Sequence, residues 1–294
     1  MSEQGADRLF QKSVNNVYRL FLYQVLMITE VAKYVTEDKY KRSQKHLVTE
    51  EDKNLSTQLW DNGIIQAIVN DDGFKRKVQV EKLKYLIEAD VVKSIYKMLV
   101  EKSYYQEYIS KTEPSLKDDK KVLKLLFKEI MQESELYGDY LDDHFTNWMD
   151  DDETIESAIT SLIMNFRILS NDAPIVALRR VRDWDEKVQF GKELLQHTLN
   201  YKKDLIALIT PQLKNWELDR VSQIDVILLQ LALSELLYFP TIPVKVSINE
   251  YIDISKSYST PKSKDFINGI LDKLMNTLKQ EGRITKLGRG LVGF

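Results

Sequence analysis

Apolar residues recur at three- and four-residue steps along most of this chain, which is the spacing of an amphipathic helix. A first long helix is predicted over residues 7–35, with an apolar face wide enough to be buried on two sides. Residues 36–75 are polar and broken, and the helical period returns over 78–109. Further helices are predicted at 184–200, 202–214, 219–238, 244–258 and 263–281. The pattern therefore predicts an all-α protein of roughly ten helices.

Two stretches of the chain resemble each other at a constant shift of 68 residues. Residues 124–163 align with 192–231, so that Asn147-Trp148 falls on Asn215-Trp216. Any two helical stretches share leucines, but the matched Asn-Trp pair favours a duplicated three-helix unit. A break follows at Ser170 to Pro174. We expect a helical N-terminal region over 1–180 and a second domain over 181–294.

Composition narrows the class of protein. Charged residues make up 30% of the chain, and only 10 Gly and 6 Pro interrupt it, which favours helix. The chain has no Cys, as expected of a protein in a reducing cytoplasm, and this excludes disulfides and thiolate metal sites. No apolar run is long enough for a membrane span, and the opening residues MSEQGADRLF lack the features of a secretory signal. We expect a cytoplasmic protein.

Charge is unevenly distributed along the chain. The formal net charge is −3, yet Pro240 to Phe294 carries nine basic side chains against five acidic ones. A locally basic region on an acidic chain is expected where a single face meets phosphate. The tail after Gln280, which is rich in Gly and Arg, is predicted to be mobile.

The residues indicate no catalytic, cofactor or metal site. The three histidines, His46, His144 and His197, are scattered, and the acidic runs near 142 and 150 lack the spacing of a calcium loop. Gly-rich phosphate loops, dinucleotide fingerprints and nucleophile elbows are absent from the sequence. We therefore expect no enzyme activity.

Polar residues inside the apolar helices near the end of the chain are more informative. Glu235 lies among leucines, and a buried carboxylate needs hydrogen-bond donors. Pro243 suits the first turn of the next helix, so we expect Glu235 to accept bonds from the backbone N–H groups that follow it. Asn249 and Glu250, in that next helix, are expected to hydrogen bond between helices.

The segment TPKSKDFINGILD, residues 260–272, is the candidate binding site. Lys262, Ser263 and Lys264 open a helix, whose free N–H groups and positive dipole end suit a phosphate. Phe266 lies one turn inside and can stack an unpaired base, and Asn268 can contact a base edge. Core packing of Phe266 and ordinary solvation of both lysines are the alternatives. Gly269 costs helix stability, so we expect it to permit close helix packing.

Three features in fixed order carry a family resemblance: ALSEL at 232–236, IPVKVSINE at 242–250 and PKSKDFINGILD at 261–272. From about Trp184 onward the chain resembles the NusB family of transcription antitermination factors. The resemblance implies a multi-helix NusB-like bundle that holds boxA-like single-stranded RNA together with the ribosomal protein NusE. It further implies an indirect link to the RNA polymerase elongation complex in ribosomal RNA transcription. Asp225 is then a candidate partner contact.

The chain departs from the family pattern in two places. Asp265 occupies a position after the turn where the family often has a basic residue. Compact and long NusB proteins open with an Arg-rich helix, whereas residues 1–12 here hold only Arg8 and Lys12 as basic residues. Either that helix is missing or this lineage replaced it, and we expect weaker RNA affinity as a result.

Two other functions are compatible with this resemblance. A helical protein-interaction scaffold that kept the fold and lost RNA binding is favoured by the weakly basic N-terminus. An RNA cytosine methyltransferase with a NusB-like domain would need a nucleotide-binding α/β domain and a Cys nucleophile, and the sequence supplies no Cys.

Overall fold

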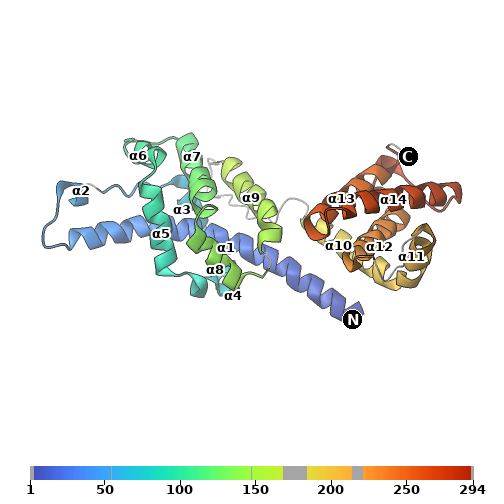
Figure 1. Cartoon of the computed structure of the whole chain (residues 1–294). Helices are drawn as coiled ribbons and strands as arrows, with labels where there is room; N and C mark the ends of the chain where they lie inside the picture. Colours follow the sequence, from blue (N-terminus) through green and yellow to red (C-terminus); the bar gives the residue numbers. More distant parts are fainter. Residues whose placement is uncertain (1–2, 54, 147, 168–183, 214–220, 293–294) are drawn as a thin grey trace. The chain divides into compact units, whose positions relative to one another are not determined.

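The computed structural model describes residues 3–53, 55–146, 148–167, 184–213 and 221–292. These described residues are helical, without a strand among them, so the all-α prediction is confirmed (Figure 1). They fall into two compact units. Unit 1 comprises Met1–Gln11 with Trp184–Phe294, and unit 2 comprises Lys12–Asp183. Within the described ranges, no helix combines the length and the hydropathy that a membrane span requires.

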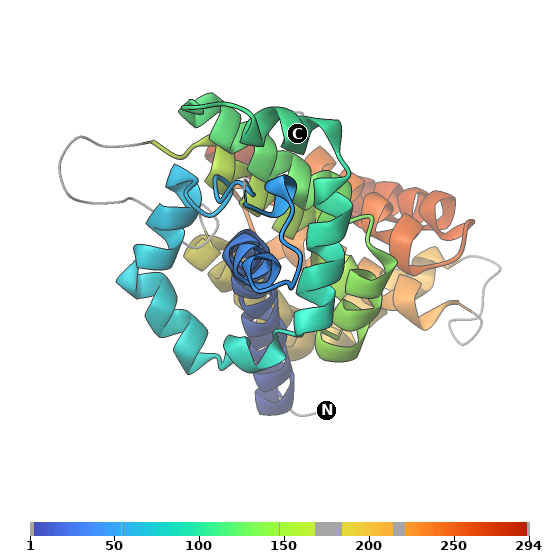
Figure 2. The same ribbon diagram turned by 90° about the vertical axis from the view of Figure 1, so that its left-hand side faces the viewer.

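Helix α1 (Glu3–Ser43) forms the centre of unit 2. Between Leu20 and Val35 nearly all of its apolar side chains are buried. The other helices of unit 2 surround it when it is viewed end-on (Figure 2). A helix that other helices surround must be apolar on most sides, which explains the broad apolar face predicted from the sequence.

Around α1, unit 2 is built from short helices that short turns connect. Some of their starts are capped by side chains: Ser115 and Asp118 form a reciprocal capping box, and Asp71 accepts a bond from the backbone N–H of Phe74. The helices are α2 (Glu50–Lys53), α3 (Gly63–Asn70), α4 (Asp72–Val80), α5 (Ala89–Val100), α6 (Ser103–Ile109), α7 (Leu116–Leu126), α8 (Glu135–His144) and α9 (Trp148–Met164). A 3₁₀ turn, η1 (Leu83–Leu86), precedes α5, and a π-helix, η2 (Phe127–Met131), follows α7.

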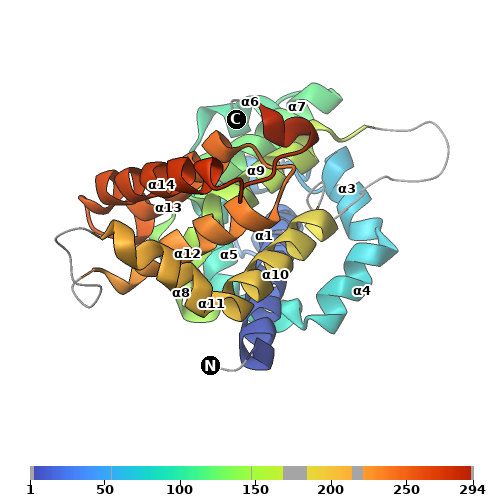
Figure 3. The same ribbon diagram turned by 90° about the vertical axis from the view of Figure 1, so that its right-hand side faces the viewer.

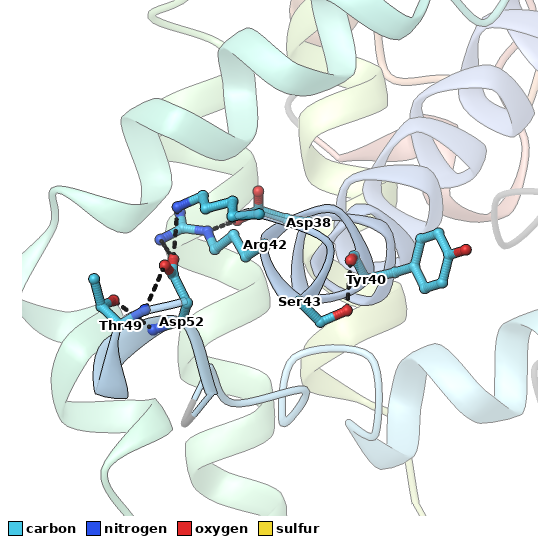
Figure 4. A network of polar contacts seen from close by, with 7 residues as sticks. Asp38, Tyr40, Arg42, Ser43, Thr49 and Asp52 are labelled. Atoms are coloured by element: carbon cyan, nitrogen blue, oxygen red, sulfur yellow. Dashed lines mark hydrogen bonds and ion pairs between the residues drawn. The ribbon is translucent and has the colours of Figure 1, made fainter. Parts of the chain in front are cut away.

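Helix α1 continues beyond its predicted end at residue 35, because ionic contacts support its last turns. Arg42 pairs with Asp38 one turn earlier, at 2.8 Å, and also approaches Asp52 (Figure 4). Asp52 is buried and accepts hydrogen bonds from Lys45 at 2.7 Å and from the backbone N–H of Thr49 at 3.2 Å. The Lys45 ammonium lowers the pKa of Asp52 to about 2. The polar stretch after α1 is thus tied to the helix by one carboxylate.

The C-terminal part of unit 1 has helices close to their predicted bounds. They are α10 (Trp184–Asn200), α11 (Lys202–Ile209), α12 (Gln223–Tyr238), α13 (Val244–Tyr258) and α14 (Ser263–Gln280), with 3₁₀ turns η3 (Thr210–Gln212) and η5 (Gly288–Leu291). The second half of α12 is buried around most of its circumference, and α13 and α14 pack against each other and against α12 (Figure 3). This core positions the start of α14.

The first turns of α1 belong to unit 1, in contrast to the predicted boundary at residue 180. Ala6 is buried, and Asp7 lies 3.8 Å from the ammonium of Lys192 on α10. The Phe10 ring fits against Gly191, where an added Cβ would lie 2.8 Å from it. The start of α1 therefore packs on α10, which residue patterns near the start of the chain did not indicate.

The tail after α14 is packed rather than mobile, which corrects our expectation. Lys286 is buried and donates to the carbonyl of Phe239 at 3.0 Å, and the Leu287 N–H donates to the carbonyl of Pro240 at 2.9 Å. Burial lowers the pKa of Lys286. A Cβ at Gly290 would lie 2.0 Å from the same Pro240 oxygen. Glycine is needed there because the two backbones touch at the turn between α12 and α13.

The proposed duplication stays a prediction. Both stretches contain helices in the expected places, α8 and α9 in one and α11 and α12 in the other. The aligned residues that favoured a duplication, Asn147 and Asn215-Trp216, lie outside the described residues.

Candidate nucleic-acid interface

The start of α14 is basic and largely exposed. Lys262 occupies the N-cap position and Lys264 the first turn, and both side chains are exposed. The side chain of Lys262 makes no capping hydrogen bond to the helix start. Two ammonium groups thus lie at the positive end of the helix dipole and favour an anion, while Asp265 in the same turn opposes it.

Ser263 and Asp225 have structural roles that differ from the predicted ones. Ser263 is 2% exposed, and its hydroxyl donates to one carboxylate oxygen of Asp225 at 2.8 Å. Ser259 donates to the other oxygen at 2.6 Å. Asp225 is itself 5% exposed, so it offers no surface to a partner, and Ser263 offers none to RNA. The three side chains instead fix the start of α14 against α12, because a buried carboxylate requires such donors.

The remaining predicted RNA contacts lie on two flanks of α14. Lys262 and Phe266 are four residues apart and share one face, and so do Lys264 and Asn268. The two pairs are offset by two residues, or roughly 200° around the helix. Phe266 is half-buried, whereas Asn268 is exposed. Asn268 therefore cannot contact the edge of a base that stacks on Phe266, which corrects the predicted constellation.

The flank that carries Lys262 and Phe266 extends further along α14. Gly269 and Lys273 follow at positions that keep the same side of the helix, and Lys273 is exposed. A Cβ at Gly269 would meet no atom within 4 Å, so the expected close helix packing is wrong. We name Lys262, Phe266, Gly269 and Lys273 the basic flank. Lys273 was missed in the sequence, although its spacing of seven residues from Phe266 is a usable signal.

Glu235 holds α12 and α13 together. It is 6% exposed and accepts hydrogen bonds from the hydroxyl of Ser247 at 2.6 Å and of Tyr251 at 2.9 Å. Burial, together with the charge of Glu235, raises the pKa of Tyr251. The donors are side chains of α13 rather than the backbone N–H groups after Pro243, which is the N-cap of that helix. The spacing of four residues between Ser247 and Tyr251 is the signal that sequence reasoning overlooked.

Asn249 and Glu250 do not hydrogen bond between helices as expected. Both are exposed on α13, on the side away from its buried residues. Their side chains face solvent because the buried face of this helix is already filled by Val244, Ile248 and Tyr251.

Apolar side chains are exposed close to the Asp225 network. Ile224 and Ile227, at the start of α12, are 40% and 49% exposed. Ile254 and Tyr258, at the end of α13, are 38% and 51% exposed. The two helix ends are held together by Ser259, which bonds to Asp225. We name these four residues the apolar face. Across the part of the chain that the structure describes, no group of three or more His, Asp or Glu side chains is placed to hold a metal ion.

Comparisons with known proteins match the C-terminal part of this chain. The family model described as NusB family matches residues 167–276. The chain is 42% identical over 105 residues to the transcription antitermination protein NusB of Salinibacter ruber, which covers 36% of this chain and 66% of that protein. It is 44% identical over 100 residues to the NusB of Chloroherpeton thalassium, covering 34% and 47%.

A third relative is matched over most of its length. The NusB of Bacillus pumilus is 37% identical over 113 residues, which cover 38% of this chain and 86% of the relative. The chain thus spans less than two thirds of the first two relatives and most of the third. On this match, and on the helices that carry it, the chain belongs to the NusB family.

Proposed function

We propose that this protein is a non-catalytic, RNA-binding transcription antitermination factor of the NusB type. In this proposal it acts in the cytoplasm during ribosomal RNA transcription. It binds boxA-like single-stranded RNA together with NusE, and through them joins the RNA polymerase elongation complex. The family membership supports the class of function, and the basic flank supports RNA as the ligand.

The basic flank carries the proposal. Lys262 lies about two turns before Gly269 and Lys273 about one turn after it, with the aromatic ring of Phe266 between the two exposed lysines. A single strand can stack a base on Phe266 while the lysines contact phosphates, and the missing side chain at Gly269 lets the strand approach the helix backbone. Lys264 adds another cation at the start of α14, beside Lys262. The contact is small, which agrees with the expectation of weak affinity for RNA alone.

We place the protein partner on the apolar face rather than at Asp225. Exposed isoleucines and a tyrosine, on two helix ends that the Ser259–Asp225 bond joins, are residue types found at the centre of protein interfaces. The scaffold alternative also uses this face, so only an RNA measurement separates the two functions.

The test is a titration of fluorescein-labelled boxA-like RNA with the full chain, with and without NusE. We expect Phe266→Ala to weaken binding by at least about fivefold, since one stacked base contributes roughly 1–3 kcal/mol. Lys273→Gln should lower the slope of log affinity against log salt by about 0.7, as one phosphate contact is lost. Lys245→Gln, an exposed lysine on α13, is the matched control.

Flat titrations with and without NusE would contradict RNA binding and leave the scaffold function. If Phe266→Ala and Lys273→Gln weaken binding no more than the control Lys245→Gln, the basic flank is not the RNA site. Ile227→Asp should weaken binding only when NusE is present.

A further inference from the structure

Unit 2 contains a cavity of about 590 Å³ beside α1. This volume lies within the usual range of small-molecule sites, about 300–1,000 Å³. Its floor is apolar and is formed by Leu26 of α1 and by Phe74 and Val78 of α4. Lys82, Lys84 and Tyr85 line it from the η1 turn. All the lining residues belong to unit 2, so the cavity does not depend on unit 1.

The η1 turn is anchored so that Tyr85 stands in solvent. Leu83 is fully buried, and the carbonyl of Leu86 accepts hydrogen bonds from the hydroxyls of Tyr23 and Tyr140. Lys82 has a φ of 54°, the only positive φ of a non-glycine residue within the described ranges. Lys82 follows Glu81, the C-cap of α4, and a left-handed residue at this position is a common way for a helix to end. Tyr85, between the two anchored leucines, is 87% exposed.

The charge around this ring is positive. Lys84 adjoins Tyr85 and Lys82 lies three residues before it. Both lysines are exposed, and neither forms an ion pair with a described residue. Lys75, also at the cavity, pairs with Asp72 at 3.3 Å. Glu30 is the single acidic residue of the lining, and the amide of Gln79 can both donate and accept. An apolar hollow, an exposed ring on an anchored turn and two lysines without an ion-pair partner among the described residues fit a ligand with a flat apolar part and a phosphate.

We propose that this cavity is a second site for single-stranded RNA, in addition to the basic flank of α14. One base stacks on Tyr85 at the mouth of the cavity, and the adjacent phosphates contact Lys82 and Lys84. Stacking on an aromatic ring with cations beside it is the general mode of single-strand binding. The inference rests on the proposed function only for RNA as the class of ligand. An acidic apolar peptide is the competing occupant. The positive rim also attracts such a peptide, but its binding does not require an exposed aromatic ring for stacking.

The experiment measures anisotropy of a fluorescein-labelled single-stranded RNA that carries a boxA-like core and uridine-rich flanks, with the full chain. We expect Tyr85→Ala to weaken binding at least about fivefold, and Tyr85→Phe to restore it because the ring is retained. Lys84→Gln should lower the salt slope by about 0.7. Tyr40→Ala is the matched control. Tyr40 is 68% exposed on α1 between two lysines and points away from its neighbours (Figure 4), but it does not line this cavity.

Each outcome separates this site from the basic flank. Losses in Tyr85→Ala but not in Tyr40→Ala support the second site, whatever Phe266→Ala does. Binding that depends on Phe266 and ignores Tyr85 overturns the second site and keeps the proposed function. A full chain that binds no RNA overturns both. Saturable binding of an acidic amphipathic peptide that Tyr85→Ala abolishes, without RNA binding, also overturns the site as an RNA site. Unchanged circular dichroism of each variant excludes misfolding.

Discussion

Burial decides what each carboxylate of unit 1 does. Asp225 and Glu235 are buried, and each accepts hydrogen bonds from two hydroxyls on the following helices. Glu250 and Asp265 are exposed on the helices that these pairs position. Exposed acids are replaceable, whereas a buried one leaves its donors unsatisfied when it is removed.

Glu235→Ala should lower the free energy of unfolding by about 1–3 kcal/mol, because the hydroxyls of Ser247 and Tyr251 lose their acceptor inside the core. Glu235→Gln should lose less, since its amide oxygen still accepts one bond. Urea denaturation measures both. Glu250→Ala is the matched control and should change stability by less than about 0.5 kcal/mol. Equal effects of Glu235→Ala and Glu250→Ala would contradict the role of Glu235.

At this scale the sequence predicted which polar residues were unusual but not their partners. A Glu among leucines announces a buried carboxylate. Whether its donors are backbone N–H groups or hydroxyls depends on how α13 is rotated against α12, which the local pattern does not specify. The rotation of α13 also placed Asn249 outside, and the rotation of α14 placed Ser263 inside.

Helix α14 shows a conflict between stability and ligand access at the scale of one element. Its buried face is a regular stripe that fixes its orientation in the core. Its basic flank contains Gly269, which packs against nothing within 4 Å. A glycine that helix packing does not need is explained if a ligand approaches the backbone there.

Gly269→Ala should therefore have opposite effects on two measurements. The free energy of unfolding should rise by up to about 1 kcal/mol, since alanine is the better helix former and meets no clash. RNA affinity should fall, because the new methyl group stands between Phe266 and Lys273. Urea denaturation and the RNA titration measure the two. Stability and affinity that rise together would argue against a strand at this flank.

The bounds of α13 and α14 followed from periodicity, because each of these two helices has one buried stripe. The packing of the tail did not follow from periodicity. Lys286 donates to a carbonyl of the α12–α13 turn and Gly290 packs closely against another, and this turn is about fifty residues away along the chain. Glycine and arginine content is the same for a mobile tail and for one that packs closely against backbone.

Across the whole molecule, the response to acid depends on carboxylates with lowered pKa values, and Asp52 of unit 2 is the best placed of them. Its pKa lies at about 2, below the ordinary 3.8, because Lys45 hydrogen bonds to the ionised form. A carboxylate of this kind stabilises the folded state above its unfolded pKa. That stabilisation is lost as the pH falls through the folded value.

Wild type should thus be more stable than Asp52→Asn at neutral pH, and the difference should shrink between about pH 4 and pH 2. Thermal unfolding followed by circular dichroism across this range measures it. Asp72→Asn, which removes a carboxylate that is 85% exposed, serves as the control. A difference between wild type and Asp52→Asn that does not depend on pH would contradict the ion pair as its source.

The family and the all-α class were predictable at this scale, because three polar signatures in fixed order are specific to the C-terminal helices. The assignment of Met1–Gln11 to unit 1 was not. Its apolar residues Ala6 and Phe10 fit any helix start, and their partner α10 is separated from them by all of unit 2.

That separation has a consequence for synthesis on the ribosome. The first turns of α1 emerge long before α10, and at about 5–20 residues per second the intervening chain takes on the order of ten seconds or more to translate. During that delay Phe10 cannot pack against Gly191, while the rest of α1 can already pack with the other helices of unit 2. The unit that carries the family signature can therefore be completed only after the whole of unit 2 has been translated.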